Sequence, residues 1–225
     1  MLVRSFIAPM FATNCWVIAN EARGECIIVD PGASDMSSIS SGGVSDEIKL
    51  IVSEEGFKPV AALLTHGHLD HTFSIKALAD GYQIPTYIHS EDRRFIAEPA
   101  GILSPEFASH LGSMQFSEPN QVEALRDGAI LEFIGLNIRA IHSPGHTKGS
   151  LMFMVNDELL ISGDVLFAGS IGRTDLPTGS ASEMRKTLLT KVLSLSDDVR
   201  VLPGHGQETT IKLERKNNPY LKELS

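Results

Sequence analysis

Short apolar runs rich in β-branched residues recur along the whole chain, and glycine and proline separate them. Such runs predict strands, because β-branched side chains suit an extended backbone whereas glycine and proline favour the turns between strands. The predicted strands cover residues 2–7, 15–19, 25–29, 60–64, 86–88, 130–134, 138–141, 151–155, 159–161 and 200–202.

Three predicted helices lie between these strands. The second covers residues 69–79, and the third begins with the capping-box pair Ser180 and Glu183 before apolar positions at helical spacing up to residue 193. The first has an apolar face formed by Val44, Ile48, Ile51 and Val52, and Gly56 is the expected glycine at its C-terminal end. Strands that alternate with helices are typical of a layered α/β or α+β fold.

Residues 97–127 interrupt this rhythm, because prolines and glycines break up weakly periodic sequence at Pro99, Gly101, Pro105, Gly112 and Pro119. We expect this segment to be a long excursion, or lid, that shapes a substrate entrance. On either side of it, residues 1–90 and 128–210 each offer strands followed by a helix. This predicts a pseudo-symmetric sandwich within one domain that spans residues 1–225.

The composition is that of an ordinary folded protein, with 42% apolar and 21% charged residues in a chain of 225. No apolar stretch approaches the ~20 residues of a membrane-spanning helix, and the N-terminus shows no cleavable signal pattern. We therefore expect a cytoplasmic protein with no membrane partner. Cys15 and Cys26 lie in predicted strands, where free thiols are expected and a disulfide or redox pair is the alternative.

The charge balance argues against a nucleic-acid partner. Nineteen basic and 28 acidic residues give a net charge of −9. Basic residues cluster only at Arg93-Arg94 and within residues 212–216, which is too little for a surface that follows a phosphate backbone. The oligomeric state is not indicated by the sequence.

Three of the eight histidines fall in one window, Thr65-His66-Gly67-His68-Leu69-Asp70-His71, after the apolar run 60–64. In an extended chain His66 and His68 point the same way, and a turn into helix at Leu69 directs Asp70 and His71 elsewhere. One loop can therefore serve two adjacent metal positions, and Gly67 lets its backbone approach that centre. A lone histidine is more often a turn or surface residue, but clustered imidazoles are costly to bury without a cation.

Three further ligand-type side chains each follow a predicted strand and a glycine: His146, Asp164 and His205. Together, five imidazoles and two carboxylates suit two divalent ions, with Zn²⁺ as the expected metal and Fe or Mn as alternatives. A carboxylate can bridge two ions whereas an imidazole nitrogen cannot, so Asp164 is the expected bridge. The expected sets are His66, His68 and His146 on one ion, and Asp70, His71 and His205 on the other.

Such a pair of ions predicts hydrolytic chemistry, because two ions about 3.5–4 Å apart hold a shared water as hydroxide near neutral pH. His89, His110 and His142 do not follow a strand and a glycine in this way. His142 precedes His146 by four residues, so a place behind that ligand is an alternative to a surface position.

The sequence resembles the metallo-β-lactamase superfamily and, within it, the glyoxalase II-like hydrolases. The resemblance covers nearly the whole chain and is carried by Thr13-Asn14-Cys15-Trp16, Ile28-Val29-Asp30-Pro31-Gly32, the 65–71 window, residues 143–146, Gly163-Asp164-Val165-Leu166-Phe167, Gly172-Arg173-Thr174-Asp175, Pro203-Gly204-His205-Gly206, Thr209-Thr210 and Asn218-Pro219-Tyr220. It implies a four-layer αββα sandwich with a dinuclear site at one edge between the sheets.

The resemblance also implies an activity, because the glyoxalase II members cleave the thioester of S-2-hydroxyacylglutathione. The expected substrate is a small-molecule acyl-thiol, with Asp70 and Asp164 in the catalytic centre and a metal-bound hydroxide as the nucleophile. A thiolate with a pKa of about 8.5 leaves with little help from a general acid. Full-length members add a C-terminal helical segment that contacts glutathione, and this chain ends soon after His205, so other thiol carriers stay open.

Arg173 follows Asp164 in a glycine-rich loop, and we expect it to meet a substrate carboxylate, with a structural Arg173–Asp175 pair as the alternative. The alternative function is a persulfide dioxygenase, a branch with a similar Gly-Arg-Thr-Asp stretch and one iron bound by two histidines and an aspartate. All seven ligand types are present, which favours the dinuclear hydrolase. A β-lactamase is less favoured because such enzymes need no bridging aspartate at the Asp164 position. A nuclease would need a basic exosite, and a non-catalytic metal-binding module would leave two open-sided ions unexplained.

Overall fold

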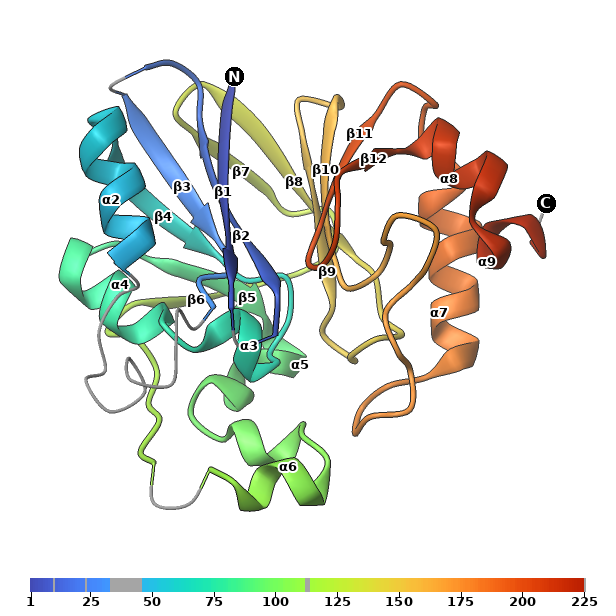
Figure 1. Cartoon of the computed structure of the whole chain (residues 1–225), viewed down its shortest axis with the longest axis horizontal. Helices are drawn as coiled ribbons and strands as arrows, with labels where there is room; N and C mark the ends of the chain where they lie inside the picture. The colour runs from blue at the N-terminus through green and yellow to red at the C-terminus, as the bar shows by residue number, and fades with distance from the viewer. Residues whose placement is uncertain (10, 23, 33–45, 112–113, 225) are drawn as a thin grey trace.

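Two six-stranded sheets face each other in the computed structural model, which describes residues 1–9, 11–22, 24–32, 46–111 and 114–224 (Figure 1). The first sheet contains β1 (Leu2–Ala8), β2 (Thr13–Ala19), β3 (Glu25–Val29), β4 (Lys58–Leu63), β5 (Thr86–His89) and β6 (Val122–Leu125). The second contains β7 (Ile130–Phe133), β8 (Leu136–His142), β9 (Leu151–Val155), β10 (Leu159–Gly163), β11 (Arg200–Pro203) and β12 (Thr209–Thr210).

Each half of the chain builds one sheet, with the strands in sequence order from edge to edge. In the first sheet β1 to β3 pair antiparallel and β3 to β6 pair parallel. In the second, β7 to β10 pair antiparallel, β10 pairs parallel with β11, and β12 closes the edge antiparallel. The ten predicted strands are all present, and the two-sheet arrangement of the halves is as predicted.

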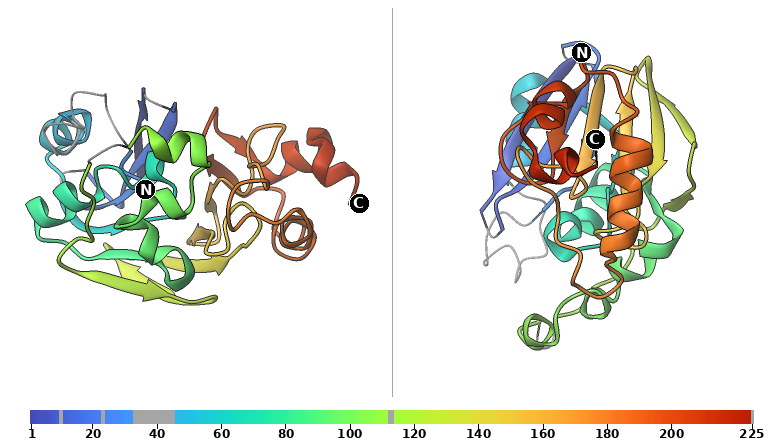
Figure 2. Two further views of the ribbon diagram at one scale, coloured as in Figure 1. Left: turned by 90° about the horizontal axis from the view of Figure 1, so that it is seen from below. Right: turned by 90° about the vertical axis from the view of Figure 1, so that its right-hand side faces the viewer.

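Helices cover the outer face of both sheets (Figures 1 and 2). The first sheet is covered by α2 (Asp46–Glu55) and α4 (Ile75–Tyr82), and the second by α7 (Ala181–Thr187), the π-helical turn η3 (Leu188–Val192), α8 (Ile211–Asn217) and α9 (Pro219–Lys222). Short helices gather at the lower end in Figure 1, namely α3 (Leu69–Thr72), α5 (Ser90–Arg93), η1 (Arg94–Ile96), η2 (Pro99–Gly101) and α6 (Pro105–Ser109). The layers form the αββα sandwich of the metallo-β-lactamase fold.

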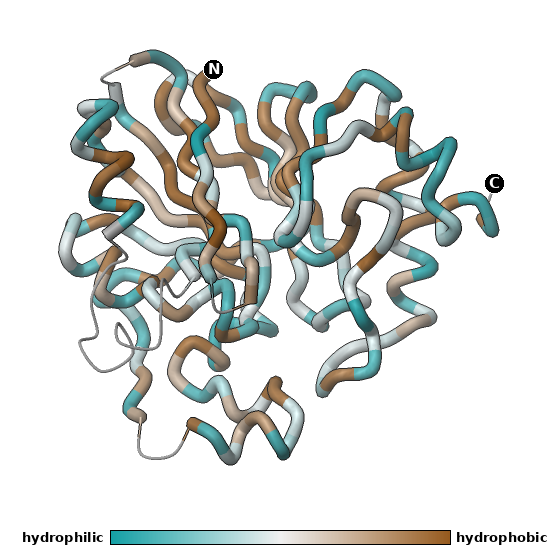
Figure 3. The backbone as a smooth tube through the Cα atoms, in the orientation of Figure 1, coloured by the Kyte–Doolittle hydropathy of each residue, from teal (hydrophilic) through white to brown (hydrophobic). Residues whose placement is uncertain are grey.

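Strand β2 shows why four layers form, because it is buried along its whole length. Cys15, Val17 and Ala19 pack on the side of α2 and α4, whereas Trp16 and Ile18 pack between the two sheets. Successive side chains of a strand point to opposite faces, so a strand that is apolar at consecutive positions, as β2 is from Cys15 to Ala19, needs cover on both sides. Figure 3 shows the result as hydrophobic central strands with mixed polarity in the outer helices.

The helix predicted over residues 69–79 is two helices, α3 and α4. The break has a tertiary cause: the backbone N–H of Ser74 donates to the Pro31 carbonyl at 2.9 Å, and its hydroxyl donates to the Gly32 carbonyl at 3.0 Å. The capping box of the third helix is confirmed, with the Ser180 hydroxyl accepting from the N–H of Glu183. Val44 of the first helix and Gly112 of the excursion lie outside the described residues.

The two cysteines are free and buried. The strand register pairs Cys26 with Ala19, which places Cys15 four residues further along β2 and out of reach of a disulfide. Burial raises the pKa of both thiols, to about 12 for Cys26. The expectation of free thiols is confirmed, and neither is a reactive thiolate at neutral pH. Among the described residues no helix is long and apolar enough to cross a bilayer.

Replacing Phe153 by alanine tests the core between the sheets. The Phe153 side chain is fully buried there, and losing a buried phenyl ring lowers the free energy of unfolding by about 3–5 kcal/mol. For a chain of this length we expect a melting temperature lower by about 6–20 °C in thermal unfolding. Leu189→Ala is the control, because Leu189 is 45% exposed. Equal melting temperatures for the two variants would contradict this assignment of the core.

Candidate metal centre

The seven side chains predicted as ligands converge where loops from both sheets meet. Each follows the C-terminal end of a strand: four come from the loop and helix α3 after β4, and one each comes from the loops after β8, β10 and β11. They form two sets that a third, overlapping group of His66, His71 and Asp164 connects. The histidine trio is His66, His68 and His146; the second set is Asp70, His71 and His205; and Asp164 lies between them.

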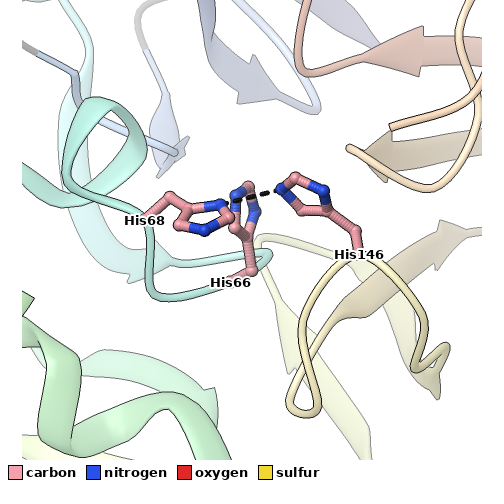
Figure 4. A group of neighbouring side chains, drawn as sticks. All are labelled: His66, His68 and His146. Carbon is pink, nitrogen blue, oxygen red and sulfur yellow. Dashed lines mark hydrogen bonds between the residues drawn. The ribbon is translucent and has the colours of Figure 1, made fainter. Parts of the chain in front are cut away.

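The histidine trio is buried, and its rings gather at one point (Figure 4). The ring centroid of His66 lies 4.8 Å from that of His68 and 4.7 Å from that of His146. The Nδ1 atom of His68 approaches the Nε2 atom of His146 to 2.8 Å. The three residues each offer a ligand atom, and these atoms lie within 4.8 Å of one another, so the trio could hold one ion.

The second set is equally compact. The Nε2 atom of His71 lies 3.3 Å from Nε2 of His205, and each of these atoms lies 3.4 Å from Oδ2 of Asp70. The Asp70 carboxylate is held in place by the Thr13 hydroxyl, which donates to it at 2.8 Å. Two imidazoles and one carboxylate therefore face a second common point.

Asp164 contacts both sets. Its Oδ1 atom lies 3.4 Å from Nε2 of His71, and its Oδ2 atom lies 3.4 Å from Nε2 of His146 and 3.5 Å from Nε2 of His205. The Asp164 carboxylate thus contacts members of both sets, which is the position that a bridging ligand would need. Gly204 makes room for it, because a Cβ atom there would overlap the Asp164 carboxylate.

The outer nitrogens of the imidazoles are engaged by protein acceptors, which leaves the inner ones free. Nδ1 of His71 donates to Asp30 at 2.9 Å. Nδ1 of His66 donates to the Thr65 hydroxyl at 3.0 Å, and that hydroxyl donates to Asp30 at 2.6 Å. One buried carboxylate thus orients one histidine from each set, with Nε2 as the lone-pair nitrogen.

His146 and His205 follow the same pattern. Nδ1 of His146 donates to the Arg173 carbonyl at 2.7 Å, and Nδ1 of His205 donates to the Ala12 carbonyl at 3.3 Å. His68 presents its other edge, with Nδ1 toward His146. All five imidazoles therefore turn a nitrogen inward.

A pair of divalent cations fits this donor set. The Nε2 atoms of His66 and His68 and Oδ1 of Asp164 are buried and have no hydrogen-bond partner, whereas buried polar atoms are normally satisfied. Of these atoms, Nε2 of His66 and Oδ1 of Asp164 belong to the ligand groups, whereas His68 turns Nδ1 toward His146. Buried lone pairs without a donor are what a cation stabilises. The trio would hold one ion, the second set would hold the other, and Asp164 would reach both.

The charges of the centre shift one another's pKa values. Burial and the neighbouring His146 lower the pKa of His68 to about 3. Burial alone would also lower the pKa of His71, but the carboxylates of Asp70 and Asp164 outweigh it and raise that pKa to about 9. Burial would raise the pKa of Asp164, yet the imidazoles hold it below its ordinary value. The carboxylates are therefore ionised at neutral pH, as ligands must be, and a metal ion would displace the proton that they hold on His71.

Two sequence-based interpretations need correction. Gly67 does not serve a close approach to the metal positions, because a Cβ atom there would meet the Asp92 carbonyl at 2.9 Å and Phe95 at 3.1 Å. Gly67 thus serves the packing of the loop on α5 and η1.

His142 does not lie behind His146. Its ring stacks on the ring of His89, with the centroids 4.1 Å apart and an angle of 5° between the planes.

A cavity of about 360 Å³ opens beside the centre. Polar ligands form its floor, and its walls are mostly apolar side chains: Phe11, Leu69, Leu103, Phe107, Phe167 and Leu176. Leu103, Ser104 and Phe107 belong to the 97–127 excursion, which therefore shapes the entrance as predicted. The same segment also supplies β6, an edge strand that its short apolar pattern did not predict.

Arg173 fits both interpretations that the sequence left open. Its side chain lines the cavity, and its guanidinium also forms a bidentate pair with Asp175 at 2.8 and 2.7 Å. Its carbonyl orients His146, a role that the sequence did not indicate.

Further residues at the centre were not among the predicted ones. Asn14 donates from Nδ2 to the carbonyls of Pro203 and Gly206 at 3.0 and 2.8 Å, which ties β2 to the His205 loop. Thr13 and Asn14 stand in one of the motifs that carried the resemblance, so a signal for them was present. Asp92 had no such signal.

Comparison with known proteins identifies the family. Residues 8–205 match the model of the metallo-beta-lactamase superfamily. The chain belongs to this superfamily. Membership indicates a metal-dependent hydrolase with divalent metals, and the two sets described above are the residues available to hold them.

Among curated relatives, an uncharacterized protein of Mycobacterium tuberculosis is 39% identical over the full length of both chains. The hydroxyacylglutathione hydrolase GloC of Haemophilus influenzae is 33% identical, with 96% of this chain and 95% of that protein covered. The probable metallo-hydrolase YqgX of Bacillus subtilis is 30% identical, with 97% and 96% covered.

Solved structures share the fold. The B3 metallo-beta-lactamase BLEG-1 is 30% identical with a TM-score of 0.84, covering 98% of this chain and 99% of that one. TTHA1623 in a di-iron-bound form is 28% identical with a TM-score of 0.75, covering 98% and 100%. ETHE1 from Myxococcus xanthus, at 24% identity and a TM-score of 0.74 over 97% and 84%, shows the fold alone.

Removing the metals with a strong chelator is expected to lower the thermal stability. Ligands that bind only the folded state stabilise it by about 2.7 kcal/mol at a hundredfold excess over Kd, and for a chain of this length that corresponds to about 5–10 °C in melting temperature per ion. Differential scanning calorimetry of metal-loaded, chelated and reloaded protein measures this. A chelated protein that melts with the loaded one would contradict a buried metal centre.

Proposed function

We propose that the chain is a dinuclear metal-dependent thioester hydrolase of the glyoxalase II type, acting on small-molecule S-2-hydroxyacyl-thiols such as S-lactoylglutathione. The observation that supports it best is the place of Asp164, whose carboxylate contacts His146 of the trio and both His71 and His205 of the second set. The similarity to the Haemophilus hydroxyacylglutathione hydrolase over nearly the full length of both chains supports the substrate class.

When bound, the two ions would supply Lewis acidity and bring the pKa of a water near neutrality. Neighbouring side chains of this protein fix the orientation of the ligands. Asp30 fixes His66, through Thr65, and His71 with their Nε2 atoms inward. Thr13 holds the Asp70 carboxylate toward the second set. Little reorganisation is then needed when substrate arrives, which is how prearranged groups lower a barrier.

The cavity suits a substrate that has a good leaving group. Its described lining contains no cysteine, lysine or tyrosine, and its acid–base groups are those of the ligand sets. A thiolate, with a pKa of about 8.5, can leave without a dedicated proton donor, whereas an amide nitrogen cannot. The apolar walls formed by residues such as Phe107 and Phe167 exclude water from the acyl-thiol.

The decisive experiment combines metal analysis with substrate assays. Purified protein is expected to contain two divalent ions per chain, with Zn²⁺ expected and Fe or Mn as alternatives, and to cleave 2-hydroxyacyl thioesters. Asp164→Ala is expected to lower metal occupancy and turnover together, because it removes the group that reaches both ligand sets. Full turnover with Asp164→Ala would contradict the bridging role. One iron with oxygen consumption on glutathione persulfide would instead support the persulfide dioxygenase.

Arg173→Ala tests the role of the guanidinium at the cavity wall. We expect KM to rise about tenfold for acyl-thiols that carry a carboxylate, the lower end of the effect of a charge-assisted hydrogen bond, and to stay unchanged for neutral acyl-thiols. Arg139→Ala is the matched control, since Arg139 also pairs with an exposed aspartate, Asp157, outside the cavity lining. An unchanged kcat/KM for every substrate that the enzyme accepts would show that Arg173 has only its structural role in the pair with Asp175.

A further inference from the structure

Asp92, in helix α5, is a fully buried carboxylate that lies behind the metal centre. Its Oδ2 atom accepts hydrogen bonds from the N–H of Gly67 at 2.9 Å and from the hydroxyl of Thr147 at 2.6 Å. Its Oδ1 atom accepts from the N–H of Gly149 at 2.8 Å. Gly67 lies between the first two members of the histidine trio, and Thr147 directly follows the third. One carboxylate therefore joins the loops, one from each sheet, that carry the whole trio.

The two loops are shaped to receive this carboxylate. A Cβ atom on Gly149 would come to 2.5 Å from the carboxylate carbon of Asp92, and one on Gly67 would come to 2.9 Å from its carbonyl oxygen. Burial raises the pKa of Asp92, although the hydrogen bonds from Thr147 and the two glycines oppose the rise. A carboxylate held only by neutral donors is costly to bury, so its place there favours a specific role over general packing.

The second set of ligands has other supports. The hydroxyl of Thr13 holds Asp70, the carboxylate of Asp30 holds His71, and the Ala12 carbonyl accepts from His205. Asp92, by contrast, accepts hydrogen bonds from both the loop of His68 and the loop of His146, and so connects these two loops. The two metal positions share Asp30, which orients one histidine of each, but the hydrogen bonds of Asp92 go to the loops of the trio.

We propose that Asp92 is a positioning residue for the ion held by the histidine trio: by joining the two loops it sets the spacing of the three imidazoles, and the second set does not depend on it. The inference rests on the two-ion centre of the proposed function but not on its thioester substrate.

Asp92→Asn tests this without changing the size of the side chain. Both carboxylate oxygens accept from backbone N–H groups, so either orientation of the amide turns an NH₂ group toward an N–H donor and breaks one loop contact. In calorimetric titration of chelated protein with Zn²⁺, we expect one of the two binding events to weaken about 10–100-fold, as for other groups that orient metal ligands. The other event is expected to stay within about threefold of the wild type.

Asp80→Asn is the matched control. Asp80 also accepts a backbone N–H, that of Asn120 at 2.8 Å, and it lies on α4, where its other partner is Lys76 at 2.8 Å. Asp80→Asn is expected to leave both binding events unchanged. If Asp92→Asn binds both ions with wild-type affinity, or weakens both events equally, the proposal is wrong.

A milder variant keeps the test available if Asp92→Asn does not fold. Thr147→Val removes one hydrogen bond to Asp92 and is expected to weaken the same binding event about 3–10-fold; unchanged affinity for both ions would overturn the proposal. A wild-type chain that binds two ions but cleaves no thioester would instead refute the thioesterase proposal, so the two failures are distinguishable.

Discussion

The structure depends on bringing five imidazoles and two carboxylates together at one edge of the sandwich, so that their ligand atoms lie close to one another. Lone pairs at these separations repel one another, and orphaned atoms such as Nε2 of His66 have no donor to satisfy them. A divalent cation on each side of Asp164 turns this repulsion into attraction. The fold therefore has to deliver seven ligand atoms with an accuracy that only rigid strand ends provide.

The sandwich does this by placing every ligand just beyond the C-terminal end of a strand. Each half of the chain contributes one sheet, so the site can form only when the two sheets pack against each other through the core around Phe153 and Trp16. Links across the edge complete the arrangement. Asn14 ties β2 to the His205 loop, and Asp92 joins the His68 and His146 loops.

Much of this could be predicted from the sequence because it is encoded locally. Apolar periodicity located ten strands, and the 65–71 window located the ligand loop with the split between its two sets. What could not be predicted depends on distant contacts. The break between α3 and α4 comes from the hydrogen bonds of Ser74 to Pro31 and Gly32, and the short strand β6 is set by pairing with β5. Asp92 follows no glycine turn, and its role appears only once both loops are in place.

Anomalous X-ray diffraction from crystals of the metal-loaded protein, recorded at the absorption edge of the bound metal, is the most direct test of the central claim. The account predicts two peaks about 3.5–4 Å apart, one beside the histidine trio and one beside the second set, with Asp164 reaching both. A single peak, or two peaks that Asp164 does not join, would contradict it.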